Sequence, residues 1–343
     1  MKSIDLRSDT VTLPTKEMMQ AINDSNLGDD VYGEDQTTNN LENLAAKITG
    51  KESALLVSSG TMGNLISCLT HCERGTEAIM GNKSHTFIYE SGGISVYGGI
   101  HSHQLLNNED GTMDLNLIKE AIRPNDIHFP KTSLICIENT HNKCFGYPLD
   151  LDYINKLSNI AHENNIKIHM DGARIFNACV ALDLPLEKIL ENIDSITFCL
   201  SKGLASPIGS IICGNKKFIQ KARRIRKSLG GGMRQTGIIA SCGIISLNKM
   251  TSRIKDDHIN AKYLANEIVK LESIEMNIDN VQTNIVYFNF KHNKFNVNDL
   301  IKHMKSKNIL FSNYQSNKCR IVTHYGITRK DIDFVIDEFN RFL

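Results

Sequence analysis

The sequence has no excess of charge of either sign and no long apolar run. Its 343 residues include 39 lysines and arginines against 38 aspartates and glutamates. This balance creates no field that would draw the protein to nucleic acid or an anionic membrane. No apolar run approaches 18 residues, and residues 1–9 are charged where a signal peptide would be apolar. We therefore expect a cytoplasmic protein with a small, neutral or zwitterionic substrate and neither a nucleic-acid nor a membrane partner.

The cysteines lack the pattern of a disulfide framework or a metal site. There are nine, an odd number, and several lie inside apolar runs, as Cys199 and Cys213 do. Reduced core thiols have this distribution. Cys68, His71 and Cys72 share a helix face, but no second ligand pair follows at a zinc-like spacing. We expect no disulfide and no metal.

Apolar runs of strand length alternate with amphipathic helical stretches through the middle of the chain. We expect strands at 54–57, 77–80, 133–138, 167–171, 195–199 and 210–213, and helices at 152–163 and 216–228. This order is typical of a parallel sheet covered by helices. After a long helical stretch over 236–271, we expect a strand (284–290), a helix (298–307), a strand (318–323) and a helix (329–342).

These elements predict an α/β protein with two domains. Residues 31–245 form a large, mainly parallel sheet domain, and residues 246–343 form a smaller α+β domain. Residues 1–30, with a helix expected near 15–23, pack on the small domain or on a partner subunit.

Two residues that follow strand-like runs predict a pyridoxal 5'-phosphate site. Lys202 ends the run SITFCLSK, and Asp171 ends the earlier strand IKIHMD. A lysine at the exit of a strand can bind an aldehyde cofactor as a Schiff base. A carboxylate on a neighbouring strand can hold the proton of the cofactor's pyridine nitrogen, which makes the ring a better electron sink.

A small-residue turn after the first strand could hold the phosphate. The segment SSGTMGN (58–64) precedes an apolar helix at 65–72, so backbone N–H groups would point outward there. Gly60 lets the backbone approach an anion, and Thr61 adds a hydroxyl. Small residues also make ordinary strand-to-helix turns. The turn has neither a Walker lysine nor a dinucleotide glycine pattern, which disfavours ATP and NAD.

Seven segments in order resemble the low-specificity L-threonine aldolases, a family of fold-type I pyridoxal-phosphate enzymes. They are DLRSDTVT (5–12), GDDVYGED (28–35), SGTMGN (59–64), ENTHN (138–142), HMDGAR (169–174), LSKG (200–203) and GGGMRQ (230–235). The resemblance covers most of the chain and implies a seven-stranded sheet in the large domain.

The resemblance also implies roles for individual residues. Lys202 would bind the cofactor, Asp171 would meet its ring nitrogen, and Gly60 and Thr61 would bind its phosphate. His85 would lie over the ring, and Arg234 would reach a phosphate, either in its own subunit or in a neighbouring one. Substrate binding would fall to Arg320 and, in support, the residues Ser8 and Arg174. His141, His85 or a water would contact the substrate's β-hydroxyl.

The implied activity is that of an aldehyde-lyase, which cleaves L-threonine and L-allo-threonine to glycine and acetaldehyde. A homo-oligomer, a tetramer of two close dimers, is also implied. One departure occurs at 143–149 (KCFGYPL), where relatives usually have a more glycine-rich turn. Bulk from Phe145 or Tyr147 could reshape the substrate mouth, so substrate range and stereochemical preference stay open.

Three alternative functions remain. The chain could be another pyridoxal-phosphate enzyme, such as a β-eliminating lyase, a transaminase or an enzyme similar to serine hydroxymethyltransferase. It could be a regulatory protein that kept the fold, which the presence of Lys202, Asp171, His85 and Arg320 disfavours. A metal hydrolase is disfavoured, because this sequence lacks metal-ligating residues at the required spacing.

Overall fold

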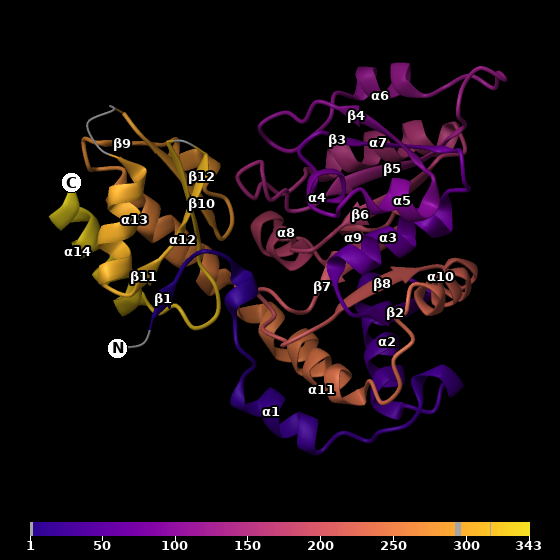
Figure 1. Ribbon diagram of the computed structural model, residues 1–343, viewed down its shortest axis with the longest axis horizontal. Helices are drawn as coiled ribbons and strands as arrows, with labels where there is room; N and C mark the ends of the chain where they lie inside the picture. The colour runs from indigo at the N-terminus through magenta and orange to yellow at the C-terminus, as the bar shows by residue number, and fades with distance from the viewer. Residues whose placement is uncertain (1–2, 292–295, 316) are drawn as a thin grey trace.

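A seven-stranded sheet forms the larger part of the protein (Figure 1). The computed structural model describes residues 3–291, 296–315 and 317–343. The strand order is β2-β8-β7-β6-β5-β3-β4. The strands are β2 (Ser53–Val57), β3 (Glu77–Gly81), β4 (His101–Leu105), β5 (Thr132–Glu138), β6 (Lys167–Asp171), β7 (Ser195–Cys199) and β8 (Ser210–Gly214). All pairings from β7 to β4 are parallel, and β8 is antiparallel to both neighbours. The predicted mainly parallel, seven-stranded sheet is confirmed.

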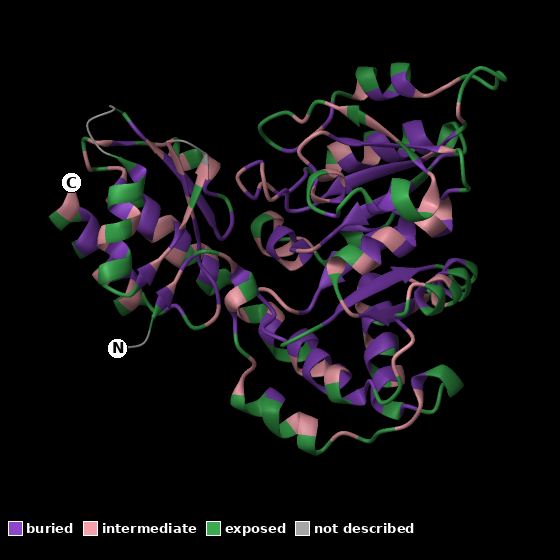
Figure 2. Ribbon diagram, in the orientation of Figure 1, coloured by how far each residue is buried: buried purple, intermediate pink, exposed green. Residues whose placement is uncertain are grey.

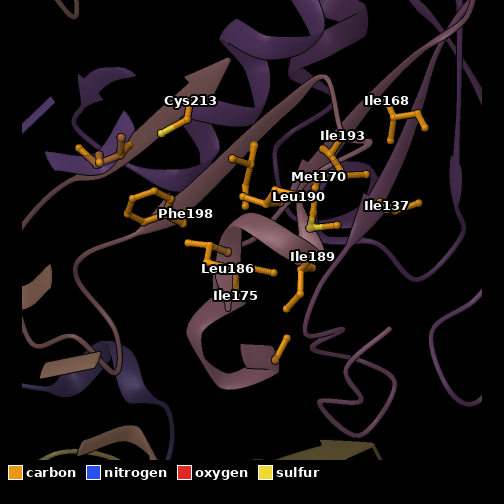
Figure 3. Packing of buried hydrophobic residues seen from close by; sticks show 14 of the residues in the cluster. Ile137, Ile168, Met170, Ile175, Leu186, Ile189, Leu190, Ile193, Phe198 and Cys213 are labelled. Carbon is orange, nitrogen blue, oxygen red and sulfur yellow. The ribbon is translucent and has the colours of Figure 1, made fainter. Parts of the chain in front are cut away.

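Both faces of this sheet are buried. On β5, Ile135 and Ile137 belong to one apolar cluster, whereas Leu134 and Cys136 belong to another. Successive side chains of a strand point to opposite faces, so continuous apolar runs require a helical cover on each side. Figure 2 shows the buried strands between more exposed helices, and Figure 3 shows part of the first cluster.

The helices that cover the two faces come from different parts of the chain. The first cluster includes side chains of α2 (Gln36–Thr49), α7 (Leu151–Glu163), α8 (Ile175–Leu182), α9 (Leu186–Ile189) and α11 (Gly237–Ile245). The opposite face packs on α3 (Gly60–His71), α5 (Gly93–Gly98) and α10 (Lys216–Ser228). The short helices α4 (His85–Ile88) and α6 (Leu115–Ala121) flank β3 and β5 in the chain.

A smaller unit follows with its own antiparallel sheet and core. Its strand order is β12-β13-β10-β9, and its strands are β9 (Ile274–Glu275), β10 (Ile285–Phe290), β12 (Ser312–Gln315) and β13 (Lys318–Val322). Side chains of α12 (Ile254–Ile268), α13 (Val297–Ser306) and α14 (Arg329–Phe342) share a separate apolar cluster with them. The predicted smaller α+β fold is confirmed.

The N-terminal segment joins this smaller unit. Strand β1 (Ile4–Asp5) pairs in parallel with β11 (Ile309–Leu310). The Leu6 N–H donates to the Leu310 carbonyl at 2.6 Å. Helix α1 (Lys16–Asn23) then packs against α11. Strand β1 and the C-terminal helix α14 both lie at the smaller unit in Figure 1.

Three local differences from the sequence prediction have physical causes. Strand β4 was missed because its sequence, HSHQL, is polar and partly exposed at the sheet edge. Helix α3 begins at Gly60 rather than at residue 65, because the Ser59 side chain caps it. The expected helical stretch over 236–271 is interrupted by a π turn (Ser246–Met250) and a 3-10 turn (Thr251–Arg253).

None of the helices in the described ranges combines the length and apolar character that a membrane crossing requires.

Candidate active site

Six of the predicted site residues line one cavity of about 160 Å³. They are Gly60, Thr61, His85, Asp171, Arg174 and Lys202. Asp171 ends β6, and Lys202 follows the neighbouring strand β7, so parallel pairing brings the two chain positions to the same sheet edge. The cavity also has Ser59, Asn64, Glu138, Asn142, Ala173, Cys199 and Ser201 in its walls.

A larger hollow, of about 880 Å³, lies along α10. It is lined mainly by basic side chains and contains neither Lys202 nor Asp171. Volume alone therefore does not identify the active site, and the smaller cavity holds the chemically informative groups.

The N-terminus of α3 forms an anion-binding wall of the cavity. The Ser59 hydroxyl accepts the Met62 N–H at 3.2 Å, and the Ser59 carbonyl accepts the Gly63 N–H at 3.0 Å. The N–H groups of Gly60 and Thr61 remain at the helix start, where no intrahelical acceptor exists. A Cβ on Gly60 would lie 2.9 Å from the Cys199 sulfur, so close packing requires glycine there. This wall fits a phosphate group.

Asn64 links the Asp171 carboxylate of the cavity wall to a second carboxylate, Glu90. Its Nδ2 group donates to Asp171 Oδ2 and to Glu90 Oε1, each at 2.9 Å. Asp171 also accepts the Ala173 N–H at 3.0 Å. The Asp171 carboxylate is thus held in the wall of the cavity that Lys202 also lines. A carboxylate in this place fits a partner for a protonated pyridine nitrogen.

His85 is oriented by the second of these carboxylates. Its Nδ1 lies 2.9 Å from Glu90 Oε1, and its backbone N–H donates to Glu138 Oε2 at 2.7 Å. Burial lowers the pKa of His85, but the Glu90 hydrogen bond and nearby carboxylates outweigh it and raise the pKa overall. Burial raises the pKa of Glu90, with Asp171 adding to the rise. His85 therefore faces the cavity with Nδ1 tied back and Nε2 available.

One ring nitrogen of His85 and one carboxylate oxygen each of Glu90 and Asp171 lie within 4.8 Å of one another, as atoms that bind a metal ion would. The hydrogen bonds through Glu90 and Asn64 account for this closeness.

His141 lies behind the cavity wall. Only 1% of the residue is exposed, and in the described structure neither ring nitrogen has a hydrogen-bond partner. Its Nε2 is 3.9 Å from Glu138 Oε2. The neighbouring Asn142 reaches the cavity, and its N–H donates to Glu138 Oε1 at 2.9 Å.

Arg174 is paired with a residue that the sequence analysis did not select. Its Nε and Nη2 donate to the two carboxylate oxygens of Asp9, each at 2.7 Å. Both side chains are buried. Burial raises the pKa of Asp9, but the Arg174 charge and hydrogen bonds, with Lys202 and Arg320, hold that pKa well below its usual range. This pair joins the N-terminal segment to the strand-β6 exit.

Arg320 lies near this pair but outside the cavity lining. It is on β13, opposite Tyr287 of β10. Burial and the Arg174 charge lower its pKa, and its buried Nε has no partner in the described structure. Asp9 thus pairs with Arg174 alone, and the nearby Arg320 guanidinium keeps capacity for a further anion.

The N-terminal segment that contains Asp9 also contains Ser8, and it contacts the backbone of Lys202. Ser8 Oγ accepts the Thr10 N–H at 3.2 Å and lies 3.5 Å from Asp9 Oδ1. The Thr12 hydroxyl donates to the Lys202 carbonyl at 2.9 Å. Ser8 adjoins the Asp9 pair without lining the cavity.

Arg234 does not reach the cavity of its own chain. Its side chain is half exposed and pairs with Asp29 at 3.0 Å.

The segment that departs from the family pattern, residues 143–149, is anchored by aromatic contacts. Phe145 packs edge-on against Tyr287, and the Lys143 ammonium lies 5.3 Å from the Tyr89 ring centre.

Several residues in or beside the site were missed, although most of them lie inside motifs that the sequence displays. Asp9 is in DLRSDTVT, Asn64 is in SGTMGN, and Glu138 and Asn142 are in ENTHN. Glu90 follows His85 by five residues. The polar residues of these motifs were the available signal.

Comparison with known proteins defines the class first. The beta-eliminating lyase family model matches residues 5–291. The crystal structure of Leishmania major threonine aldolase superposes with a TM-score of 0.82 at 18% identity, covering 99% of each chain. The protein is therefore a fold-type I enzyme of a pyridoxal-phosphate-dependent family.

Full-length relatives then define the family within that class. Low-specificity L-threonine aldolase 1 of Arabidopsis thaliana is 43% identical over 345 residues, which cover 99% of this chain and 96% of that protein. Low specificity L-threonine aldolase of Escherichia coli K12 is 41% identical, with 99% of each chain covered. The chain belongs to the low-specificity L-threonine aldolases, which are aldehyde-lyases.

Proposed function

We propose that this protein cleaves L-threonine and L-allo-threonine to glycine and acetaldehyde. The observation that carries the proposal is the convergence of Lys202, Asp171 and the α3 N-terminus on one cavity. A pair of arginines near the same cavity supplies positive charge for an amino-acid carboxylate. Family membership supports the reaction type.

Pyridoxal phosphate would be held by three groups of residues. Lys202 would bind its aldehyde carbon, Asp171 would pair with its ring nitrogen, and Gly60 and Thr61 would bind its phosphate. When bound, the cofactor supplies an electron sink for the pair of electrons released at the substrate's Cα. His85 would lie over the ring, since its imidazole lines the same wall and is fixed by Glu90.

Arg320, Arg174 and Ser8 would bind the substrate carboxylate. The unpaired Nε of Arg320 supports this role, because a buried donor without a partner is costly until an acceptor arrives. Asp9 would hold Arg174 in place and neutralise one of the two guanidinium charges. With the carboxylate fixed, the substrate's Cα–Cβ bond can be oriented for cleavage.

A base must take the β-hydroxyl proton as the Cα–Cβ bond breaks and the aldehyde leaves. His85 is the better placed of the two candidate histidines, because it lines the cavity with Nε2 free. His141 is enclosed and would act by orienting Asn142, Glu138 or a water. A proton delivered to Cα completes glycine.

Phe145 and Tyr147 would limit how long a β-substituent fits. Phe145 packs on Tyr287, whose backbone lies opposite Arg320 on the neighbouring strand. The Tyr147 hydroxyl donates to Asn280 at 2.9 Å, which fixes the turn against the smaller unit.

The chain would divide into an N-terminal segment (1–30), a cofactor-binding domain (31–245) and a small domain (246–343). The separate sheets support this division. A cytoplasmic homotetramer, built as a dimer of dimers, is the proposed assembly. The exposed Arg234 would then reach the phosphate site of a partner subunit.

Absorption spectroscopy coupled to aldehyde detection tests the function. We expect a visible band for the bound cofactor, and acetaldehyde formation from L-threonine and L-allo-threonine through alcohol dehydrogenase and NADH. A band without acetaldehyde would contradict the proposed reaction and favour an eliminating or transferring enzyme. No band would contradict the cofactor assignment.

Replacement of Arg320 by glutamine should mainly weaken substrate binding. We expect KM for L-threonine to rise about 100-fold, the scale of losing one partner of a desolvated charge pair. The value of kcat should change far less, because the reacting atoms are untouched. Arg329→Gln is a control, since Arg329 is exposed on α14. An unchanged KM in Arg320→Gln would remove Arg320 from the substrate site.

A further inference from the structure

A chain of buried polar side chains leads from the end of α3 to the cofactor-binding carboxylate. His71 Nε2 lies 2.7 Å from Ser195 Oγ, and Ser195 Oγ lies 2.9 Å from His169 Nδ1. His169 Nε2 lies 3.1 Å from Asn64 Oδ1. Asn64 in turn donates to Asp171 and Glu90. The reaction as proposed uses neither of these histidines directly.

Residue spacing creates this chain. Asn64 and His71 are seven residues apart on α3 and share a helix face. His169 and Asp171 are two apart on β6 and point to the same side of the sheet. Ser195 is the register partner of His169 on β7. Helix α3 packs across β6 and β7, so His71 and Asn64 reach the side chains of Ser195 and His169.

Hydrogen-bond chemistry permits one proton arrangement. Both Asn64 N–H groups face carboxylates, so its Oδ1 faces His169, and His169 Nε2 must carry a proton. A neutral His169 then has a bare Nδ1 that accepts the Ser195 hydroxyl proton. The Ser195 oxygen accepts from His71 Nε2. Every donor in the chain therefore points toward Asp171 and Glu90.

Burial keeps both histidines neutral. It lowers the pKa of His169 to about 4, although the Asp171 charge opposes it, and lowers the pKa of His71 to about 3. His169 has no solvent exposure and Ser195 has none. Water therefore does not compete for the bonds of His169, and aligned bonds in a low-dielectric interior strengthen one another.

We propose that His169, supported by Ser195 and His71, is a positioning residue that locks the orientation of the Asn64 amide. A reversed amide would turn its carbonyl toward two carboxylates and its N–H groups toward the His169 N–H. The Asn64 side chain thus sets both Asp171, which would pair with the cofactor's ring nitrogen, and Glu90, which holds His85. This inference rests on the proposed cofactor role of Asp171.

The test compares His169→Leu with His169→Gln. Leucine removes the donor to Asn64, whereas a glutamine amide can still donate to it. We expect His169→Leu to weaken pyridoxal-phosphate binding by the apo-protein about 10-fold, the scale of one hydrogen bond in a charged network. His169→Gln should restore binding to within about 3-fold of wild type.

His258→Leu is the matched control. His258 is also a histidine whose pKa burial lowers to about 4, but it contacts Asn177 on α8 rather than Asn64. It should bind the cofactor as wild type does. Equal weakening in His169→Leu and His258→Leu, or in both His169 variants, would overturn the proposal.

A second measurement does not use His169→Leu and therefore remains decisive if that variant does not fold. Nitrogen-15 NMR of histidine-labelled apo-protein at pH 7 should show neutral, Nε2-protonated rings for His71 and His169, assigned by His71→Gln and His169→Gln. An Nδ1-protonated or doubly protonated His169 would overturn the proposal.

These readouts do not involve threonine. A wild type that binds the cofactor without releasing acetaldehyde would contradict the proposed aldolase function and leave the positioning role intact. If the wild type cleaves threonine but His169→Leu binds the cofactor normally, the positioning role is contradicted and the aldolase function stands.

Discussion

Replacement of Lys202 by alanine is expected to abolish acetaldehyde formation from L-threonine. Lys202 is a lysine in the wall of the cavity that Asp171 and the α3 N-terminus also line. Loss of a residue that bonds covalently to the cofactor should reduce kcat on the order of 10⁴-fold or more. The visible band of the lysine-bound cofactor should disappear at the same time.

The control for this prediction is Lys119→Ala, because Lys119 is exposed on α6 away from the cavity. It should keep both the band and the activity. Substantial acetaldehyde formation by Lys202→Ala would refute the assignment of Lys202, and with it the interpretation of the cavity.

Replacement of Asp9 by asparagine should produce the largest loss of stability among single site changes. It leaves the Arg174 guanidinium buried without its carboxylate partner. Breaking a buried ion pair from one side costs about 3–5 kcal/mol. The free energy of unfolding, from denaturant titration of the holoenzyme, measures the effect.

Asp5→Asn provides a comparison within the same segment. Asp5 also pairs with an arginine, Arg7, but that arginine side chain is 52% exposed. An exposed pair of this kind contributes about 0–1 kcal/mol. Similar losses in Asp5→Asn and Asp9→Asn would show that the Asp9 pair is not a buried interaction in solution.

Acid should reveal the same pair. The folded pKa of Asp9 lies below its ordinary value of 3.8, so its stabilising contribution is present above about pH 4. The contribution is lost as the pH falls further toward the folded pKa. Asp9→Asn should therefore show a shallower decline of stability below pH 4 than wild type does.

The sequence predicts the central sheet well because its strands are buried on both faces. Runs such as LICIE and SITFC are mostly apolar, and all of their residues are buried. Polar β4 and the two-residue strands β1, β9 and β11 carry no such pattern, and β1 pairs with the distant β11. Periodicity cannot report a partner 300 residues away.

The candidate site likewise has residues whose meeting the sequence predicts and residues whose contacts it does not predict. Lys202, Asp171 and Gly60 follow strands, so their chain positions predict their meeting. The Asp9 pairing with Arg174 depends on how the N-terminal segment crosses the molecule. Asn64 and His169 gain their importance from one another through side-chain hydrogen bonds, which a strand and helix pattern does not contain.

The pairing of β1 with β11 also bears on how the chain matures during synthesis. Residues 53–214 supply every strand of the large sheet, so that sheet can assemble while the ribosome is still translating the rest. Residues 4–5 must wait for residues 309–310 before they can pair. Ser8 and Asp9 follow directly, so the carboxylate-binding groups are among the last parts to be completed. A nascent chain could therefore acquire a folded cofactor domain well before it could handle an amino acid.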